Sequence, residues 1–372
     1  MNLKVGIVGL PNAGKSTLFN ALLKKQVAEA ANYPFTTIEP NVGVVPVPDG
    51  RLEKLVALIE QEEHVKPPIV PATVEFVDIA GLVKGASQGE GLGNKFLSHI
   101  REVDLVVNVL REFEDPSVVH VAGDVDLGRD ADIIQTELLL ADLQTLAKQT
   151  EPRGVVEHDA RRRWELVGIL RAALDSGKPA RDIITDSEER ILVRDLHLLT
   201  MKPVLLVANV SESQLSLPRG PCPTAGVQAG NSQILQLSNY PILQISAKIE
   251  AELVSLSPEE QEAYLKELGL TSSGLDRLIA KAYELLGLIS FLTCGIKEVR
   301  AWTITRGTKA PQAAGVIHTD FEKKFIKADV IAYSDFASSG GWKNARDAGK
   351  ARSEGKEYIV RDWDVVEFKV GN

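Results

Sequence analysis

The chain has 372 residues, of which 44% are hydrophobic and 25% are charged, and its formal net charge is −9. This length exceeds one ordinary core, so we expect two or three globular domains. No apolar stretch is long enough to span a membrane, the N-terminus does not resemble a leader, and the only cysteines are Cys222 and Cys294. We therefore expect a cytoplasmic protein without a membrane partner, a disulfide framework or a zinc site.

The N-terminal segment predicts a phosphate-binding loop. Gly9-Leu-Pro-Asn-Ala-Gly-Lys-Ser16 follows an apolar strand-like run at 3–8 and precedes apolar residues at helical spacing in 17–23. Glycines let successive N–H groups point at phosphate oxygens, and the helix N-terminus adds partial positive charge. Lys15 is expected to reach the β- and γ-phosphates as a catalytic group, and Ser16 to ligate Mg²⁺. The expected nucleotide contacts are Pro11, Asn12, Ala13, Gly14, Lys15, Ser16 and Thr17.

Asn12 has two readings. An amide oxygen beside the phosphates could help to ligate a monovalent cation such as K⁺, whereas a hydrogen bond within the loop is the simpler role. A dependence of activity on potassium would separate the two.

The next segments predict a second part of the phosphate site. We expect strands at 43–47 and 72–78, a helix at 51–60, and a proline-punctuated loop at 32–41. Asp78-Ile-Ala-Gly81 follows the second strand, where Asp78 is expected to bind Mg²⁺ through a water and the Gly81 N–H to contact the γ-phosphate. Thr36 or Thr37 is expected to supply another hydroxyl ligand to the metal. Loops that are ordered by a triphosphate and relax after hydrolysis form a switch.

The residue after Gly81 raises a question about catalysis. Leu82 stands where proteins of this class often carry the glutamine that orients the attacking water, and leucine cannot position water. Either hydrolysis is slow and uses another group, or the protein is chiefly a binding switch.

Three more apolar runs, at 104–110, 203–209 and 240–246, predict strands that complete an α/β fold with a doubly wound parallel sheet. The stretch between the first two is too long for one crossover. This stretch is rich in Leu, Ala, Arg and Glu, and these residues follow the spacing of a helix. We therefore expect a helical insertion at about 130–200.

The segment Asn209-Val-Ser-Glu212 is expected to read the base. Many guanine-binding proteins carry Asn-Lys-x-Asp here, and Glu212 places its carboxylate one methylene further out than aspartate does. A good bidentate base contact is worth about 1–3 kcal/mol of discrimination, and adenine lacks the donors that this contact reads. We therefore favour ATP over GTP. Ser246-Ala-Lys248 closes the base pocket, and the expected contacts are Asn209, Val210, Glu212, Ser246 and Ala247.

After Leu292 the sequence predicts a small α+β module with strands at 299–304, 329–333, 358–360 and 364–370 and a helix near 321–327. Residues 297–372 carry 14 Lys and Arg against 11 Asp and Glu, a charge of +3 that leaves −12 for the rest. This small positive charge is compatible with contact to RNA but cannot supply many phosphate contacts. A stand-alone RNA-binding protein is therefore disfavoured, and we expect no sequence-specific DNA partner.

Taken together, these motifs resemble the Obg-like ATPases, the YchF family of translation-factor-class P-loop NTPases. The stretches that carry the likeness are G-L-P-N-A-G-K-S-T, N-Y-P-F-T-T-I-E-P-N, D-I-A-G-L-V-K-G-A, N-V-S-E and S-A-K. It continues at 297–304, 310–322 and 354–360, which look like the family's C-terminal TGS domain. The resemblance spans nearly the whole chain.

The resemblance implies a GTPase-type P-loop domain at 1–288 that contains a coiled-coil-like insertion, and a β-grasp TGS domain at 289–372. It also implies a preference for ATP, a hydrophobic residue at Leu82, and association with the ribosome. His120, an ordinary loop histidine by composition alone, matches a family histidine that serves hydrolysis. The segment 214–239 is longer and more irregular than the family pattern, so its contacts with adenine stay open.

The sequence thus predicts a Mg²⁺-dependent ATPase that acts as a ribosome-associated molecular switch. Two alternatives remain: an Obg-type GTPase, and a nucleotide-dependent adaptor with negligible hydrolysis.

Overall fold

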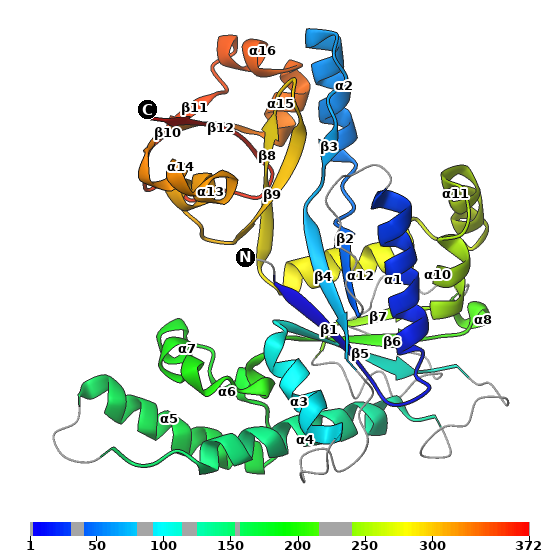
Figure 1. Ribbon diagram of the computed structural model, residues 1–372, viewed down its shortest axis with the longest axis vertical. Helices are drawn as coiled ribbons and strands as arrows, with labels where there is room; N and C mark the ends of the chain where they lie inside the picture. The colour runs from blue at the N-terminus through cyan, green and yellow to red at the C-terminus, as the bar shows by residue number, and fades with distance from the viewer. Residues whose placement is uncertain are drawn as a thin grey trace, which may run out of the picture. The chain divides into compact units, whose positions relative to one another are not determined.

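The computed structural model describes residues 3–30, 41–79, 92–113, 125–152, 157–215 and 240–371 (Figure 1). The chain forms two compact units, Met1–Lys25, Ile38–Gly43 and Glu75–Leu278 in the first, and Gln26–Thr37, Val44–Val74 and Ile279–Asn372 in the second. Several residues singled out from the sequence lie outside the described part, namely Thr36, Thr37, Gly81, Leu82, His120, Cys222 and most of the segment 214–239.

The first unit is built on a six-stranded sheet of order β2-β4-β1-β5-β6-β7. Neighbouring strands from β4 to β7 run parallel. At the edge, β2 runs antiparallel to β4, as the hydrogen bonds from Asp78 N–H to the Asn41 carbonyl and from Val47 N–H to the Ala72 carbonyl require. The strands are β1 Lys4–Val8, β2 Val42–Pro46, β4 Thr73–Asp78, β5 Leu105–Arg111, β6 Val204–Asn209 and β7 Ile242–Ile245. The expected α/β fold with a parallel sheet is confirmed.

Helices pack on this sheet because their apolar positions fall on one side. Ile100 of helix α3 (Leu92–Glu102) and Leu138 of helix α4 (Leu127–Ala147) share a buried cluster with Val8 and Val106 of the sheet. Since β1 lies inside the sheet and its neighbours run parallel to it, the carboxyl ends of β1, β4, β6 and β7 all open on one edge. Apart from the helices between β5 and β6, the helices that lie wholly or partly in this unit are α1 Lys15–Ala30, α3 Leu92–Glu102, α8 Glu212–Leu215, α10 Ala247–Leu253, α11 Pro258–Glu267 and α12 Gly274–Leu285.

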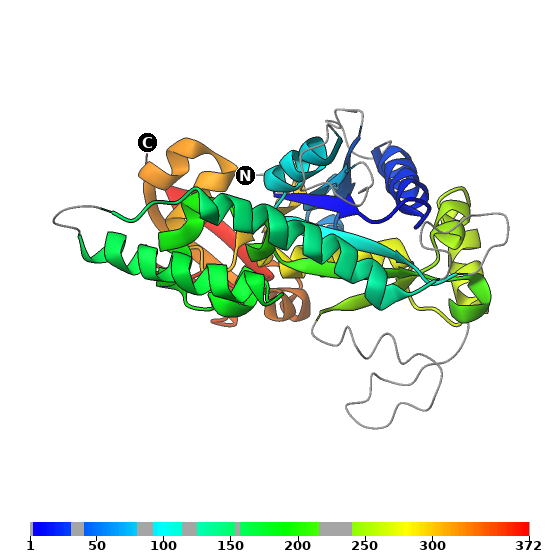
Figure 2. The ribbon, with the colours of Figure 1, turned by 90° about the horizontal axis from the view of Figure 1, so that it is seen from below.

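The helices expected between β5 and β6 are present: α4 Leu127–Ala147, α5 His158–Asp175, α6 Ala180–Ile183 and α7 Ser187–Val193. The helices α4 and α5 lie side by side and antiparallel (Figures 1 and 2), and their buried leucines, Leu146 and Leu170 among them, form one apolar cluster. The buried carboxylate of Asp142 accepts the N–H groups of Leu199 and Thr200, each at 2.8 Å. This carboxylate anchors the chain as it returns from the insertion toward β6.

The second unit contains a six-stranded mixed sheet of order β11-β10-β12-β8-β9-β3. Its strands are β3 Ile69–Val70, β8 Leu288–Cys294, β9 Val299–Thr305, β10 Phe325–Ala332, β11 Arg352–Glu354 and β12 Asp364–Val370. Its helices are α2 Arg51–Glu63, α13 Ala310–Ile317, α14 Thr319–Lys323, α15 Tyr333–Ser339 and α16 Trp342–Asp347. Burial raises the pKa of the half-buried Cys294 thiol to about 12, so this cysteine is a poor nucleophile.

Two expectations for the C-terminal module were wrong. The helix near 321–327 ends at Lys323, because Phe325, Ala328 and Val330 are buried in the core of the unit as part of β10, with a register shift after Phe325. The strand expected at 358–360 is reduced to an isolated bridge between Ile359 and Lys309.

The second unit takes in a segment from the first third of the chain. Strand β3 extends the C-terminal sheet, where Ile69 and Val70 pair with Val299 and Arg300 of β9. The guanidinium of Arg51, at the start of α2, lies 3.0 Å from the ring centroid of Trp363, a cation–π contact within this unit. The domain boundary expected at 288/289 stays a prediction.

No helix within the described ranges has both the length and the apolar character needed to cross a membrane.

Candidate nucleotide-binding site

The loop between β1 and α1 has the backbone shape of a phosphate cradle. Gly9 and Gly14 have φ angles of 155° and 96°, and Asn12 has a left-handed φ of 64°. A Cβ at Gly14 would lie 2.1 Å from Nδ2 of Asn209, and one at Gly9 would lie 2.5 Å from the Val109 carbonyl oxygen. Only glycine fits either position.

Lys15 is held inside this loop. Its side chain is buried and Nζ donates a hydrogen bond to the Leu10 carbonyl at 2.9 Å. Burial lowers the pKa of Lys15, and the charge of Asp78 opposes that effect. An ammonium group has three donors, so two of them can serve a ligand without breaking the bond to Leu10. Ser16 and Thr17 follow on the first turn of α1 with exposed side chains.

Asp78 ends β4 on the same edge of the sheet. Its Oδ1 atom is buried and has no hydrogen-bond partner within the described residues. Burial raises the pKa of Asp78, while the positive charge of Lys15 lowers it. A buried carboxylate oxygen of this kind fits a cation or a cation-bound water.

The oxygen donors near Asp78 are of the kind that hard cations such as Mg²⁺ prefer. The described residues contain no group of three His, Cys, Asp or Glu side chains that could hold a metal ion. Magnesium is usually held by one or two protein oxygens together with substrate phosphates and waters. Ser16 and Asp78 are oxygen ligands of that type, so they fit a metal that arrives with a nucleotide.

Asn209 links the phosphate loop to the base segments. It is buried at the end of β6, where Nδ2 donates to the Ala13 carbonyl at 3.0 Å and Oδ1 accepts the Ala247 N–H at 3.0 Å. The sequence predicted a nucleotide contact at Asn209, and this geometry adds a positioning role. The amide joins residues of the β1–α1 loop, β6 and α10 at a single point.

The other predicted base residues gather on the same two strand ends. Val210 is buried and donates its N–H to the Ile245 carbonyl at 2.9 Å. Ser246 and Ala247 are buried at the start of α10, whereas Lys248 is exposed. Glu212 is the first residue of the short helix α8.

The sequence did not point to three residues that support this region. The Glu112 N–H donates to the Asn209 carbonyl at 2.9 Å, and Gln214 Nε2 donates to the Glu112 carbonyl at 3.3 Å. Glu250 lies fully inside α10 between the apolar Ile249 and Leu253. A charged residue at a buried helical position was the available signal for Glu250, whereas backbone contacts such as that of Glu112 leave none.

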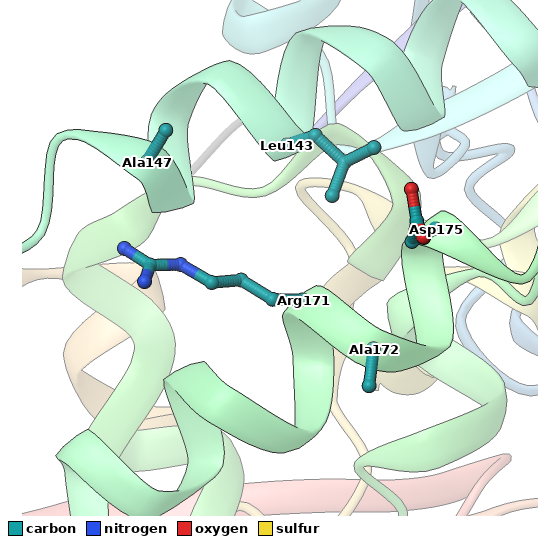
Figure 3. Close-up of a pocket in the computed structure, with 5 residues that line it drawn as sticks. All are labelled: Leu143, Ala147, Arg171, Ala172 and Asp175. Atoms are coloured by element: carbon teal, nitrogen blue, oxygen red, sulfur yellow. The ribbon is translucent and has the colours of Figure 1, made fainter.

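A separate pocket of about 580 Å³ lies in the helical insertion and contains none of the predicted site residues. Figure 3 shows Leu143 and Ala147 of α4 opposite Arg171, Ala172 and Asp175 of α5. Arg171 already donates to the Gln149 carbonyl at 3.2 Å. The roles expected of Thr36, Thr37, Gly81 and His120 fall outside the described residues and stay predictions.

Comparisons with known proteins agree with this geometry. A family model described as a 50S ribosome-binding GTPase matches residues 4–157, and the model YchF-GTPase_C, described as a protein of unknown function, matches 288–371. Two relatives carry the name "Ribosome-binding ATPase YchF". The one from Bacillus subtilis strain 168 is 48% identical and the one from Escherichia coli O157:H7 is 44% identical, each over 99% of both chains.

A solved structure gives the same result. "Structure of the Schizosaccharomyces pombe YchF GTPase" superimposes with a TM-score of 0.84 at 37% identity and covers 99% of this chain and 98% of that one. Identity at this level over the full length shows common descent, and the chain belongs to the YchF family.

Proposed function

We propose that this chain is a Mg²⁺-dependent ATPase whose nucleotide state is read by the ribosome. The observation that carries the proposal is that the buried Lys15 and the half-buried Asp78, whose charges interact, lie at the edge of the sheet where the glycine loop opens. Burial lowers the pKa of Lys15 and raises the pKa of Asp78, so it disfavours the charged form of each group. Keeping both charges at this place is costly unless a ligand binds to them.

The phosphate end would act on the triphosphate tail. The N–H groups of the loop and the free donors of Lys15 would bind the phosphate oxygens, and Ser16 and Asp78 would hold the metal together with Thr36 or Thr37. Bound Mg²⁺ would neutralise charge that develops on the phosphates. Gly81 would contact the γ-phosphate. His120 would orient the attacking water, the task of the glutamine that is replaced here by Leu82.

The choice of base must be argued from the site, because the names of the relatives differ on this point. The curated relatives are named ATPases, whereas the solved structure is titled a GTPase. One donor and one acceptor of the Asn209 amide already bond within the protein, and the paired contact with guanine falls to residue 212. The side chain of Glu212 is one methylene longer than the aspartate that usually makes the paired contact with guanine, which supports ATP.

The ribosome enters as a partner through the relatives. Their names include ribosome binding, and the model that matches residues 4–157 is described as a 50S ribosome-binding GTPase. We propose the same partner here, in the cytoplasm, with nucleotide bound by 1–288 and a TGS domain at 289–372. Potassium is a further candidate cofactor through Asn12, whose side chain is exposed beside the cradle.

Steady-state hydrolysis tests the proposal. The purified chain should release phosphate from ATP in the presence of Mg²⁺, faster with added ribosomes, and EDTA should stop the reaction. His120→Ala should lower turnover without weakening ATP binding, and exchange of K⁺ for Na⁺ tests the role of Asn12. Turnover at the uncatalysed rate in every condition, with ATP still bound, would identify an adaptor instead of an enzyme.

A further inference from the structure

Helix α10 is tied to helix α12 by a buried carboxylate. Glu250 lies three residues after Ala247 and is 1% exposed. Its Oε1 accepts the Gly274 N–H at 2.7 Å and its Oε2 accepts the Leu275 N–H at 3.2 Å. Both donors belong to the first turn of α12, where the helix dipole favours a negative charge.

The contact is close enough to depend on glycine. A Cβ at Gly274 would lie 2.7 Å from Oε1 of Glu250 and 2.9 Å from Cγ2 of Ile245, the last residue of β7. Any larger residue would therefore push α12 away from α10 and from β7 together.

The start of α12 is fastened to two more elements near the nucleotide site. Arg277 donates from Nη2 to the Gln244 carbonyl of β7 at 3.0 Å. Asp276 forms an ion pair with Lys25 of α1 at 3.0 Å. One end of α12 thus contacts α10, β7 and α1. The elements α10 and β7 flank the base segment at Ser246 and Ala247, and α1 follows the phosphate loop.

Helix capping alone does not account for Glu250. Ser273 already accepts the Asp276 N–H at 3.0 Å, a local cap of the ordinary kind. Helix α11 begins with a capping box made only of its own residues, Ser257 and the exposed Glu260. Burial raises the pKa of Glu250 even though two N–H groups stabilise its charge, so keeping a carboxylate there is costly.

We propose that Glu250 is a positioning residue for the base pocket. By fixing α10 against α12 it holds Ser246 and Ala247 in place, so that the Ala247 N–H meets Oδ1 of Asn209. Glu250 therefore sets the affinity for the base and does not affect the affinity for the phosphates. This inference rests on the proposed function.

The test compares ATP with inorganic tripolyphosphate, which has the phosphates but no base. Glu250→Gln keeps the size of the side chain and turns one acceptor into a donor that faces an N–H group. We expect the Kd of MgATP, measured by calorimetry, to rise roughly tenfold, as for a buried hydrogen bond left unmade. The Kd of magnesium tripolyphosphate should change less than about twofold, and KM for ATP should rise while kcat is kept.

Two further variants control for a general loss of structure. Gly274→Ala disturbs the same contact from α12 and should repeat the selective loss of ATP affinity, including where Glu250→Gln fails to fold. Asp142→Asn removes a second buried carboxylate that accepts two N–H groups in the same unit, at 2.8 Å each. It should lower the melting temperature by a similar amount and leave both affinities unchanged.

The outcomes are distinct. Equal weakening of ATP and tripolyphosphate in Glu250→Gln and Gly274→Ala, or no weakening of either, overturns the role of Glu250 alone. A wild-type chain that binds tripolyphosphate as tightly as ATP also overturns the inference, since the base then adds no affinity, whereas a wild-type chain that binds neither compound contradicts the proposed function.

Discussion

The two ends of the candidate nucleotide site are built in opposite ways. At the phosphate end, Lys15 is buried and Asp78 is half-buried, and the buried Oδ1 of Asp78 has no hydrogen-bond partner in the described part of the chain. At the base end, the polar atoms of Asn209 and Glu250 are bonded to the protein itself. The phosphate end therefore gains most from a ligand, whereas the base end is organised before the ligand arrives.

The largest effect is expected where the ligand supplies the partner. Lys15→Ala should lower MgATP affinity by about 2–5 kcal/mol, as for other truncated buried charge contacts. Wild-type protein at an ATP concentration of about 100 Kd should gain about 2.7 kcal/mol of stability, and the variant almost none. Thermal melts with and without ATP measure this difference. Equal stabilisation of both proteins would contradict a role for Lys15 in binding.

Asn209→Ala should separate the two ends by damaging the ligand-free protein. It leaves the Ala13 carbonyl and the Ala247 N–H without their partner, and each orphaned group costs about 1–3 kcal/mol. Denaturant unfolding without nucleotide should show this loss, unlike the same experiment on Lys15→Ala. An unchanged free energy of unfolding would mean that the amide does not organise the base end.

Asp78→Asn should act only when the metal is present. Removing a metal-site oxygen typically costs about 10–100-fold in metal affinity or activity. We expect Mg²⁺ to strengthen ATP binding by the wild-type chain and to lose most of that effect in the variant. In EDTA the variant should bind ATP at least as tightly as the wild type, because it lacks a negative charge beside the phosphate site. A variant with full Mg²⁺ dependence would exclude Asp78 from the metal site.

The smallest effect is expected at the base. Glu212→Asp restores the side chain that guanine-binding relatives of this fold class use, although the lysine of their motif is still missing. It should improve GTP binding relative to ATP by at most about 1–3 kcal/mol. Competition between the two nucleotides measures the shift, and Glu252→Asp on an exposed turn of α10 is the control.

The sequence could predict the phosphate end because its residues are contiguous or end strongly apolar strands. The loop from Gly9 to Ser16 needs glycine at the positive-φ positions 9 and 14, so its shape can be recognised from the local sequence. Asp78 ends a strongly apolar strand. The strands of the first sheet were predictable for the same reason, since each is a short apolar run.

The rest depends on contacts between distant parts of the chain. Strand β3 has two residues, Ile69 and Val70, and its partner β9 lies far along the sequence, so no periodicity reveals it. Glu250 acts on Gly274 and Leu275, which no local pattern connects to it. The strand expected at 358–360 is only a bridge, because its backbone pairing with 308–310 is limited to the Ala310 N–H with the Tyr358 carbonyl and the Val360 N–H with the Thr308 carbonyl before the chain turns at 361–364.

Calorimetric titration of the purified chain with ATP and with GTP in the presence of Mg²⁺ tests the central claim most directly. The account predicts saturable binding of ATP and GTP binding that is weaker by roughly tenfold or more, as the loss of a paired base contact implies. Tight binding of GTP with negligible binding of ATP would contradict it.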